Sequence, residues 1–105
     1  IFRKVAQKDG LFLLAVKDEQ LIATVMGGYD GHRGWVNYLA VHPHDQRNGV
    51  ATALIQQLEK RLVALGCPKL QLLIRKDNID VQSFYEQLGY EEIEVVCLGK
   101  RLISD

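Results

Sequence analysis

The segment from residue 39 to residue 58 carries the residues whose types and spacing predict chemistry. An apolar run ends at Pro43, a polar loop leads to Gly49, and an amphipathic helical pattern follows directly. The first amides of a helix have no partner within it and carry about half a positive charge. Because such amides bind phosphate groups, this order of elements predicts a phosphate or pyrophosphate site.

The small residues of this loop have a mechanical explanation. Backbone amides must approach phosphate oxygens closely, and side chains at Gly49 and Ala51 would obstruct that approach. We therefore expect the amides of roughly Arg47 to Thr52 to form the site, with Arg47 adding a charged contact. The alternatives are that Arg47 is only a surface residue and that the loop only begins a helix.

The first helix that must position this loop is expected over Gly49–Leu65. Its apolar stripe recurs at spacings of three and four and comprises Ala51, Leu54, Ile55, Leu58, Leu62 and Leu65. The face expected to contact water carries Gln56, Gln57, Glu59, Lys60 and Arg61. Gly66 is the expected left-handed stop, and Pro68 prevents continuation.

A second helix is expected over Asp80–Leu88, where apolar residues again recur at helical spacing and Gly89 ends the pattern. Asn78 precedes this helix and suits its N-cap. The opening stretch, Ile1–Lys8, is charged and resembles part of a helix. We therefore expect the natural protein to have a further N-terminal part.

Five segments have the composition of strands, namely residues 11–16, 21–29, 35–41, 69–75 and 90–99. The first two form a predicted antiparallel hairpin, in which Gly27-Gly28 predicts a bulge or a close backbone approach. The long crossover through the first helix implies parallel, right-handed pairing of the third and fourth strands. Alternation divides the third strand into one face with Val36, Tyr38 and Ala40 and another with Asn37, Leu39 and Val41.

Composition limits the classes of function. The 105 residues suit a single domain, residues 1–105, and 48% hydrophobic content can build one core. Acidic and basic residues number 13 each, so neither nucleic acid nor a membrane is an expected partner. No apolar run approaches a membrane span. Cys67 and Cys97 have no metal-site spacing, so we expect reduced thiols of a cytoplasmic protein, the alternative being a regulatory disulfide or a reactive thiol.

Two motifs together resemble a known family. The run Gln46-Arg47-Asn48-Gly49-Val50-Ala51 is similar to the acyl-CoA loop of the GNAT superfamily of N-acetyltransferases, Arg/Gln-x-x-Gly-x-Gly/Ala. Asn78, followed seven positions later by Tyr85 and then by Leu88-Gly89-Tyr90, resembles the second signature of that family, with Val81 where Ala is common. The stretch M-G-G-Y-D-G-H-R-G also resembles the small bacterial YpeA-type members.

The resemblance implies a mixed-sheet α/β fold of the GNAT type, truncated at the N-terminus and lacking the first strand and helices. It implies acetyl-CoA as cosubstrate, without a metal, and an amine as acceptor. The pantetheine arm would pair with the third strand, which must separate from the fourth to admit it. The implied cofactor contacts are Leu39, Ala40, Val41, Gln46, Arg47, Asn48, Gly49, Val50, Ala51, Thr52 and Asn78.

Acyl transfer from a thioester to an amine poses two proton problems. The attacking amine must be neutral, and for a lysine-like amine at pH 7 deprotonation costs about 4–5 kcal/mol. The leaving thiolate needs only a weak acid, and the resemblance assigns that role to Tyr85. The alternative is a core tyrosine in the stripe of the second helix.

The general base is not evident from the residue types. The family often carries Glu near the positions of Asn37 or Leu73, and neither residue is acidic here. A water relay held by Asn37 and Tyr38 is one alternative, and Asp30 is another. An ordinary Asp-Gly turn is the competing interpretation of Asp30.

Aromatic residues and histidines complete the candidates. Tyr29, Trp35 and Tyr38 either line an amine pocket or pack within the sheet. His42 and His44 have no evident third ligand, so we expect no metal site, and His32 suits an exposed loop.

The sequence therefore predicts an acetyl-CoA-dependent N-acetyltransferase that acts on a primary amine. The alternative from another class is a non-catalytic acyl-CoA-binding or interaction module. A nucleotide-binding Rossmann fragment is disfavoured because no G-x-G-x-x-G follows a strand. Loss of N-terminal elements would expose a sheet edge, so we expect a homodimer, strand exchange or poor solubility.

Overall fold

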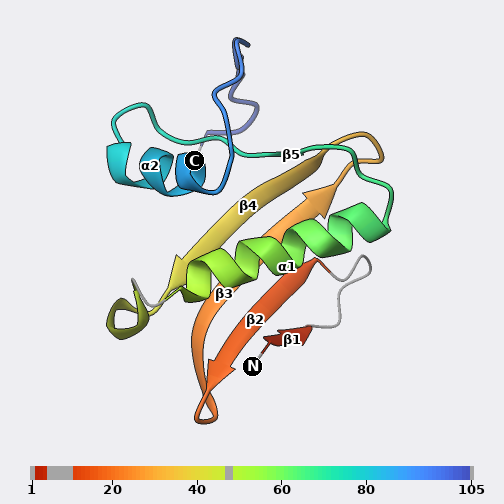
Figure 1. Cartoon of the computed structure of the whole chain (residues 1–105). Helices are drawn as coiled ribbons and strands as arrows, with labels where there is room; N and C mark the ends of the chain where they lie inside the picture. The colour runs from red at the N-terminus through yellow and green to blue at the C-terminus, as the bar shows by residue number, and fades with distance from the viewer. Residues whose placement is uncertain (1, 5–10, 47–48, 105) are drawn as a thin grey trace. The chain divides into compact units, whose positions relative to one another are not determined.

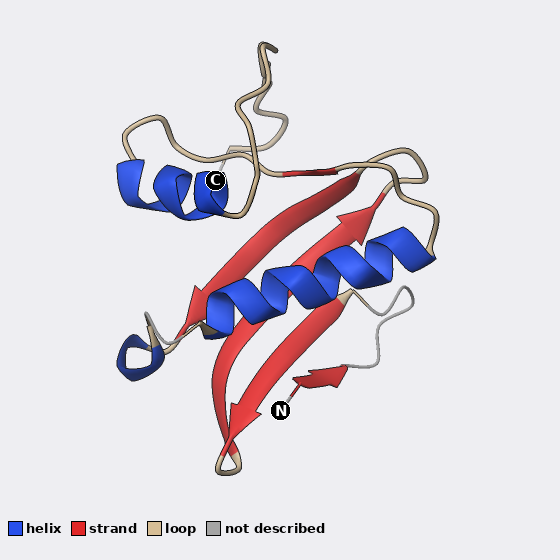
Figure 2. Cartoon of the chain, in the orientation of Figure 1, coloured by secondary structure: helices blue, strands red, loops and turns tan. Residues whose placement is uncertain are grey.

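Alternating apolar residues build the sheet that organises the first part of the chain. The computed structural model describes residues 2–4, 11–46 and 49–104, which fall into two units, residues 1–73 and 74–105. The strands of the first unit are β1 (Phe2–Lys4), β2 (Phe12–Lys17), β3 (Gln20–Tyr29), β4 (Gly34–Val41) and β5 (Leu70–Gln71). They form one sheet in the order β1-β2-β3-β4-β5 (Figures 1 and 2), antiparallel except for the β4–β5 pair.

Helix α1 (Val50–Ala64) lies across β2, β3 and β4 on one face of the sheet (Figure 1). Leu54, Ile55, Leu58 and Leu62 are buried, as the stripe predicts. Leu65 is 47% exposed, so its place in the stripe was wrong: it is the C-cap of α1, beyond the last helical turn. Gly66 adopts the predicted left-handed conformation, with φ of 85°.

Two glycines allow α1 to approach the sheet. A Cβ atom on Gly27 of β3 would lie 2.6 Å from Leu58 Cδ1, and one on Gly34 of β4 would lie 2.8 Å from Leu62 Cδ1. Neither distance leaves room for a side chain without moving a buried leucine. The predicted close backbone approach at Gly27 is therefore confirmed.

A β-bulge changes the faces of β4. Met26 pairs with Tyr38 but Gly27 pairs with Val36, so Asn37 is an extra residue without a partner in β3. Paired residues share a face of the sheet, so Val36 faces α1 with Gly27, and Tyr38 lies on the opposite face with Met26. The predicted alternation was therefore wrong for Val36, which faces α1, and for Asn37, which lies over Gly28 on the opposite face, because the bulge shifts the pattern by one residue.

The chain reaches β5 through α1, and the short parallel ladder pairs Gly34 with Leu70 and Trp35 with Gln71. The predicted parallel pairing is confirmed, but the strand is shorter than residues 69–75. Of the opening segment Ile1–Lys8, the structure describes residues 2–4, and for these the helical interpretation was wrong because Phe2–Lys4 forms β1 and pairs with β2. The other residues of the segment lie outside the described residues.

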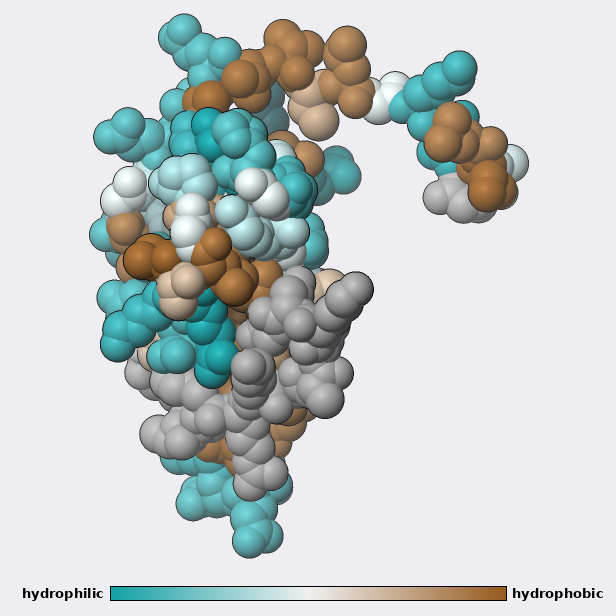
Figure 3. Space-filling view, turned by 90° about the vertical axis from the view of Figure 1, so that its right-hand side faces the viewer, coloured by the Kyte–Doolittle hydropathy of each residue, from teal (hydrophilic) through white to brown (hydrophobic). Residues whose placement is uncertain are grey.

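The second unit contains helix α2 (Ile79–Gln87), which Asn78 caps and Gly89 follows with φ of 96°. The strand expected over residues 90–99 is absent: residues 90–104 form neither helix nor strand. A strand is stable only when a neighbour pairs with its backbone, and the described part of this unit holds no other strand. Val96, Leu98, Leu102 and Ile103 of this segment are more than 80% exposed. Figure 3 shows brown, hydrophobic residues at the surface of the extended tail.

Candidate active site

The N-terminus of α1 is the first component of the site. Gly49 is its N-cap, with φ of 87°, and provides no side-chain cap. The amide of Ala53 donates a hydrogen bond to the carbonyl oxygen of Gly49 at 3.0 Å. The amides of Ala51 and Thr52, which come before it, have no acceptor within the helix. Glycine is required here by the positive φ, since a Cβ atom at Gly49 would meet nothing within 4 Å. The predicted contacts Arg47 and Asn48 lie outside the described residues.

A short 3₁₀ turn, Pro43–Asp45, joins β4 to this loop. His42 Nδ1 accepts a hydrogen bond from His44 N at 3.2 Å, and the two rings stack with centroids 5.1 Å apart. Gln46 Nε2 donates to Val41 O at 3.4 Å, which ties the loop back to the end of β4. These contacts account for both histidines as parts of the turn. In the part of the chain that the structure describes, no three His, Cys, Asp or Glu residues gather as a metal site.

One edge of β4 is open over its second half. The ladder with β5 ends at the Trp35–Gln71 pair, whereas β4 continues to Val41. Leu39, Ala40 and Val41 pair with β3 on the other side. Beyond Trp35, the described residues thus give β4 a ladder partner on one side only. An extended ligand could align with this open edge of β4 as an added strand.

The carboxylate of Asp30 holds the β3–β4 turn. Its Oδ1 accepts bonds from the amides of His32 at 2.8 Å and Arg33 at 2.7 Å, and its Oδ2 accepts one from Trp35 Nε1 at 3.2 Å. These bonds, the Arg33 amide first, lower the pKa of Asp30 from 3.8 to about 2. A carboxylate with so low a pKa is a poor proton acceptor, so the geometry favours the turn interpretation of Asp30 over the general base.

The three aromatic candidates do not share one face. Tyr29 pairs with Gly34, which lies beneath Leu62 of α1, so Tyr29 belongs to the helix side of the sheet. Trp35 pairs with Gly28, and both lie on the opposite face with Tyr38. The structure therefore brings Trp35 and Tyr38 to one face and separates Tyr29 from them.

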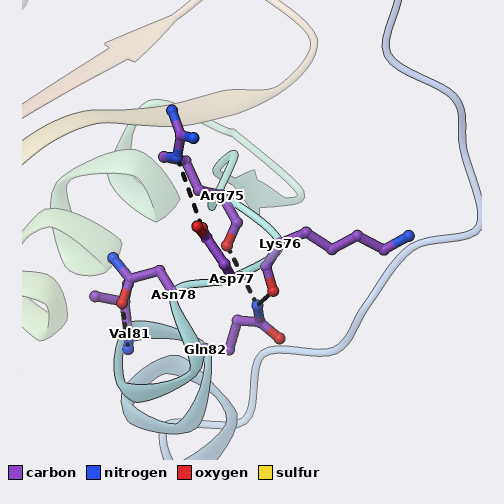
Figure 4. A network of polar contacts seen from close by, with 6 residues as sticks. All are labelled: Arg75, Lys76, Asp77, Asn78, Val81 and Gln82. Atoms are coloured by element: carbon purple, nitrogen blue, oxygen red, sulfur yellow. Dashed lines mark hydrogen bonds and ion pairs between the residues drawn. The ribbon is translucent and has the colours of Figure 1, made fainter.

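In the second unit, a hydrogen-bonded loop precedes α2 (Figure 4). Asn78 Oδ1 accepts a bond from Val81 N at 3.3 Å, which confirms its predicted capping role. Gln82 Nε2 donates to the carbonyl oxygens of Arg75, at 3.3 Å, and Lys76, at 2.9 Å. Gln82 thereby fixes the segment that carries Asn78. This role of Gln82 was not predicted, although a glutamine one helical turn after an Asn cap is a usable signal.

Tyr85 lies in α2, four residues after Val81. It is buried, and its ring packs edge-to-face against Phe84 and Tyr90, with centroids 4.9 and 5.3 Å away. Burial raises the pKa of Tyr85 from 10.0 to about 12. The hydroxyl is therefore fully protonated at neutral pH and available as a donor. The packing agrees with the core interpretation, and the role as an acid remains a prediction.

The fold and these motifs correspond to a known family. The model of the acetyltransferase (GNAT) family matches residues 2–90, and the chain belongs to this family. An acetyltransferase of Pectobacterium atrosepticum is 50% identical over 105 residues, which are 100% of this chain and 74% of that protein. In the part of the chain that the structure describes, no helix is long and apolar enough to cross a membrane.

Solved acetyltransferases share the fold. An aminoglycoside antibiotic 6'-N-acetyltransferase of Acinetobacter haemolyticus is 28% identical with a TM-score of 0.73, covering 89% of this chain and 70% of that one. The ribosomal-protein-S18-alanine N-acetyltransferase of Escherichia coli is 26% identical with a TM-score of 0.73, covering 78% and 53%. The chain is thus an acyltransferase of the GNAT family with a mixed α/β sheet. The enzyme is favoured over the non-catalytic binding module.

Proposed function

We propose that this protein transfers an acetyl group from acetyl-CoA to a primary amine by direct attack in a ternary complex. The observation that carries the proposal is the left-handed Gly49 at the start of α1, which follows the open-edged strand β4 after a short 3₁₀ turn and a loop. The α1 amides would bind the pyrophosphate. The open edge at Leu39–Val41 would pair with the pantetheine arm, and the family signature assigns Asn78 a contact with the cofactor.

The chemistry requires few groups from the protein. The amine nitrogen attacks the thioester carbonyl carbon, the C–S bond breaks, and the thiolate takes up a proton while the nitrogen loses one. We assign the proton donation to Tyr85. Because its pKa is about 12, Tyr85 carries its proton at neutral pH. It gives this proton to the thiolate as the C–S bond breaks and regains one from solvent. A water relay at Asn37 and Tyr38 would remove the proton of the amine.

Membership of the family supports a primary amine as the acceptor. It does not specify which kind of amine. One relative is named for aminoglycosides and another for a protein alanine. Small molecules, protein N-termini and lysines are therefore all proposed acceptors for this chain. We also propose a cytoplasmic location and a homodimer, and the exposed apolar side chains after α2 support self-association.

To test this proposal, the release of free CoA thiol from acetyl-CoA is measured in the presence of a panel of amines. Tyr85→Phe keeps the ring and removes the hydroxyl, so we expect kcat to fall by about 10²–10⁴-fold with acetyl-CoA affinity unchanged. Tyr90→Phe is the matched control, because Tyr90 packs on Tyr85 and the family signature accepts Phe there. Equal kcat for Tyr85→Phe and the wild type would refute the assignment.

A further inference from the structure

The two histidines that follow β4 have no part in the proposed reaction, yet contacts within one turn fix both of their rings. His42 is the N-cap of the 3₁₀ turn Pro43–Asp45, and its Nδ1 accepts a hydrogen bond from His44 N at 3.2 Å. The ring of His44 stacks on that of His42 with an interplanar angle of 27°. The imidazole of His42 therefore makes the bond that Asn, Asp or Ser makes at most N-caps.

The backbone of His42 is anchored to the sheet. Its amide donates to Ile22 O of β3 at 2.7 Å, and its carbonyl oxygen accepts a bond from Asp45 N at 2.8 Å. His42 is thus held by β3 on one side and by the turn on the other. Because the side chain of Gln46 also bonds to Val41 O, both ends of the turn are tied to the sheet.

This turn lies between the two parts of the proposed cofactor site. β4 ends at Val41, and α1 begins after Gly49 (Figure 2). The open edge of β4 is proposed to pair with the pantetheine arm, and the first amides of α1 are proposed to bind the pyrophosphate. The cap of the turn therefore bears on how these two parts are placed relative to each other.

The Nδ1 atom of His42 has a second partner nearby. Asp45 Oδ2 lies 3.9 Å from it, and the side chain of Asp45 is only 14% exposed. A neutral ring with its proton on Nε2 accepts the amide of His44. A protonated imidazole has a donor at both nitrogens, so it gives up this bond and pairs with the carboxylate of Asp45. His44 is a further titratable group that faces the ring.

We infer that His42 is a positioning residue that sets the α1 N-terminus against the end of β4 for cofactor binding, and that this action requires the neutral ring. The inference rests on the proposed function. When the cap is lost, the binding arrangement is populated less, and the apparent affinity falls by that fraction. Imidazole changes its charge between about pH 5 and 8, so the cap is present above this range and is lost below it.

The experiment compares His42→Ala, His42→Asn and His42→Gln with the wild type by calorimetric titration with acetyl-CoA. The Oδ1 atom of asparagine takes the place of Nδ1 and does not titrate, whereas the amide of glutamine lies one bond farther, in the place of Nε2. At about pH 8, the Ala and Gln variants should bind acetyl-CoA about 2–30-fold more weakly, which is the equivalent of one N-cap. His42→Asn should bind as the wild type does.

The pH dependence separates the two capping side chains. At about pH 5.5, the wild type should lose its advantage over His42→Ala, because its ring no longer accepts the amide of His44. His42→Asn should keep its advantage. Titration of the cofactor phosphates affects all the proteins equally, so the ratio of affinities reports on His42 alone. The matched control is His32→Asn, which removes an exposed histidine at the other end of β4 and should leave affinity unchanged at both pH values.

Unchanged affinity in folded His42→Ala, or failure of His42→Asn to restore it, would overturn the inference. A wild type that gains affinity over His42→Ala as pH falls would also overturn it, because the ring would then act through its charge. If His42→Ala does not fold, the comparison of His42→Gln with His42→Asn decides. If the folded wild type binds no acetyl-CoA, the proposed function fails and the inference falls with it.

Discussion

The contact between Gly27 and Leu58 gives the sharpest prediction about stability. In Gly27→Ala, the new methyl group would lie 2.6 Å from Leu58 Cδ1 and 3.1 Å from Cδ2, whereas carbon atoms pack best at about 3.5–4.0 Å. Leu58 is 0% exposed, so it must retreat by about 1 Å into filled space. Overpacking of this kind lowers the free energy of unfolding by about 1–3 kcal/mol. Replacing glycine also reduces the conformational freedom of the unfolded chain, which raises the free energy of unfolding by about 0.4–1 kcal/mol.

We therefore expect Gly27→Ala to lower the free energy of unfolding by about 1–2 kcal/mol, measured by urea titration. The matched control is Gly99→Ala, whose methyl group meets nothing within 4 Å. In a Leu58→Ala background, which alone costs about 2–5 kcal/mol, Gly27→Ala should be neutral or stabilising because the clash has gone. An equal cost of Gly27→Ala in both backgrounds, or a cost no greater than that of the control, would refute the packing argument.

Four other residues give predictions that separate their roles. The raised pKa of Tyr85 adds stability below pH 10.0 that is lost as pH rises towards about 12, so Tyr85→Phe should flatten alkaline unfolding curves. The lowered pKa of Asp30 adds stability above pH 3.8 that is lost as pH falls towards about 2, and Asp30→Asn should remove that acid slope. Asn78→Ala should cost about 0.5–2 kcal/mol in urea unfolding, as lost N-caps do. Gly49→Ala should cost about 1–2 kcal/mol because its φ is 87°, a prediction that a cost below that of Gly99→Ala would contradict.

Local signals predicted much of the fold. The helical stripe, the stops at Gly66 and Gly89 and the cap at Asn78 depend on residues a few positions apart, and the structure confirms them. The bulge was also anticipated near Gly27-Gly28. Its consequence was not, because periodicity cannot show which of two paired strands holds the extra residue, here Asn37 of β4.

Errors arose where structure depends on distant partners. The apolar alternation of residues 90–99 predicted a strand, but a strand needs a neighbouring edge that the described part of its unit does not provide. Residues 2–4 show only a weak strand pattern in the sequence. They form β1 because they pair with β2. Side-chain roles such as that of Gln82, which bonds to two carbonyl groups, depend on a loop geometry that spacing alone does not specify.

The candidate site also has parts that local signals predicted and parts that they could not predict. The order of strand, glycine loop and helix predicted an anion site from physical principles, and the structure supplies the left-handed Gly49 that such a site uses. Residue types could not predict the role of Tyr85, because a buried tyrosine in an apolar stripe has the pattern of a core residue. Its role as an acid, and the contact of Asn78 with the cofactor, remain predictions that rest on the family.

The most direct test of the account is calorimetric titration of the folded protein with acetyl-CoA, free CoA and ATP. We predict that acetyl-CoA and CoA bind at one site, that ATP binds more weakly, and that Gly49→Glu weakens acetyl-CoA at least about tenfold. Gly99→Glu, which adds the same charge far along the chain, should bind as the wild type does. Absence of acetyl-CoA binding to folded wild-type protein, or equal affinity in Gly49→Glu, would contradict the assignment of the α1 N-terminus.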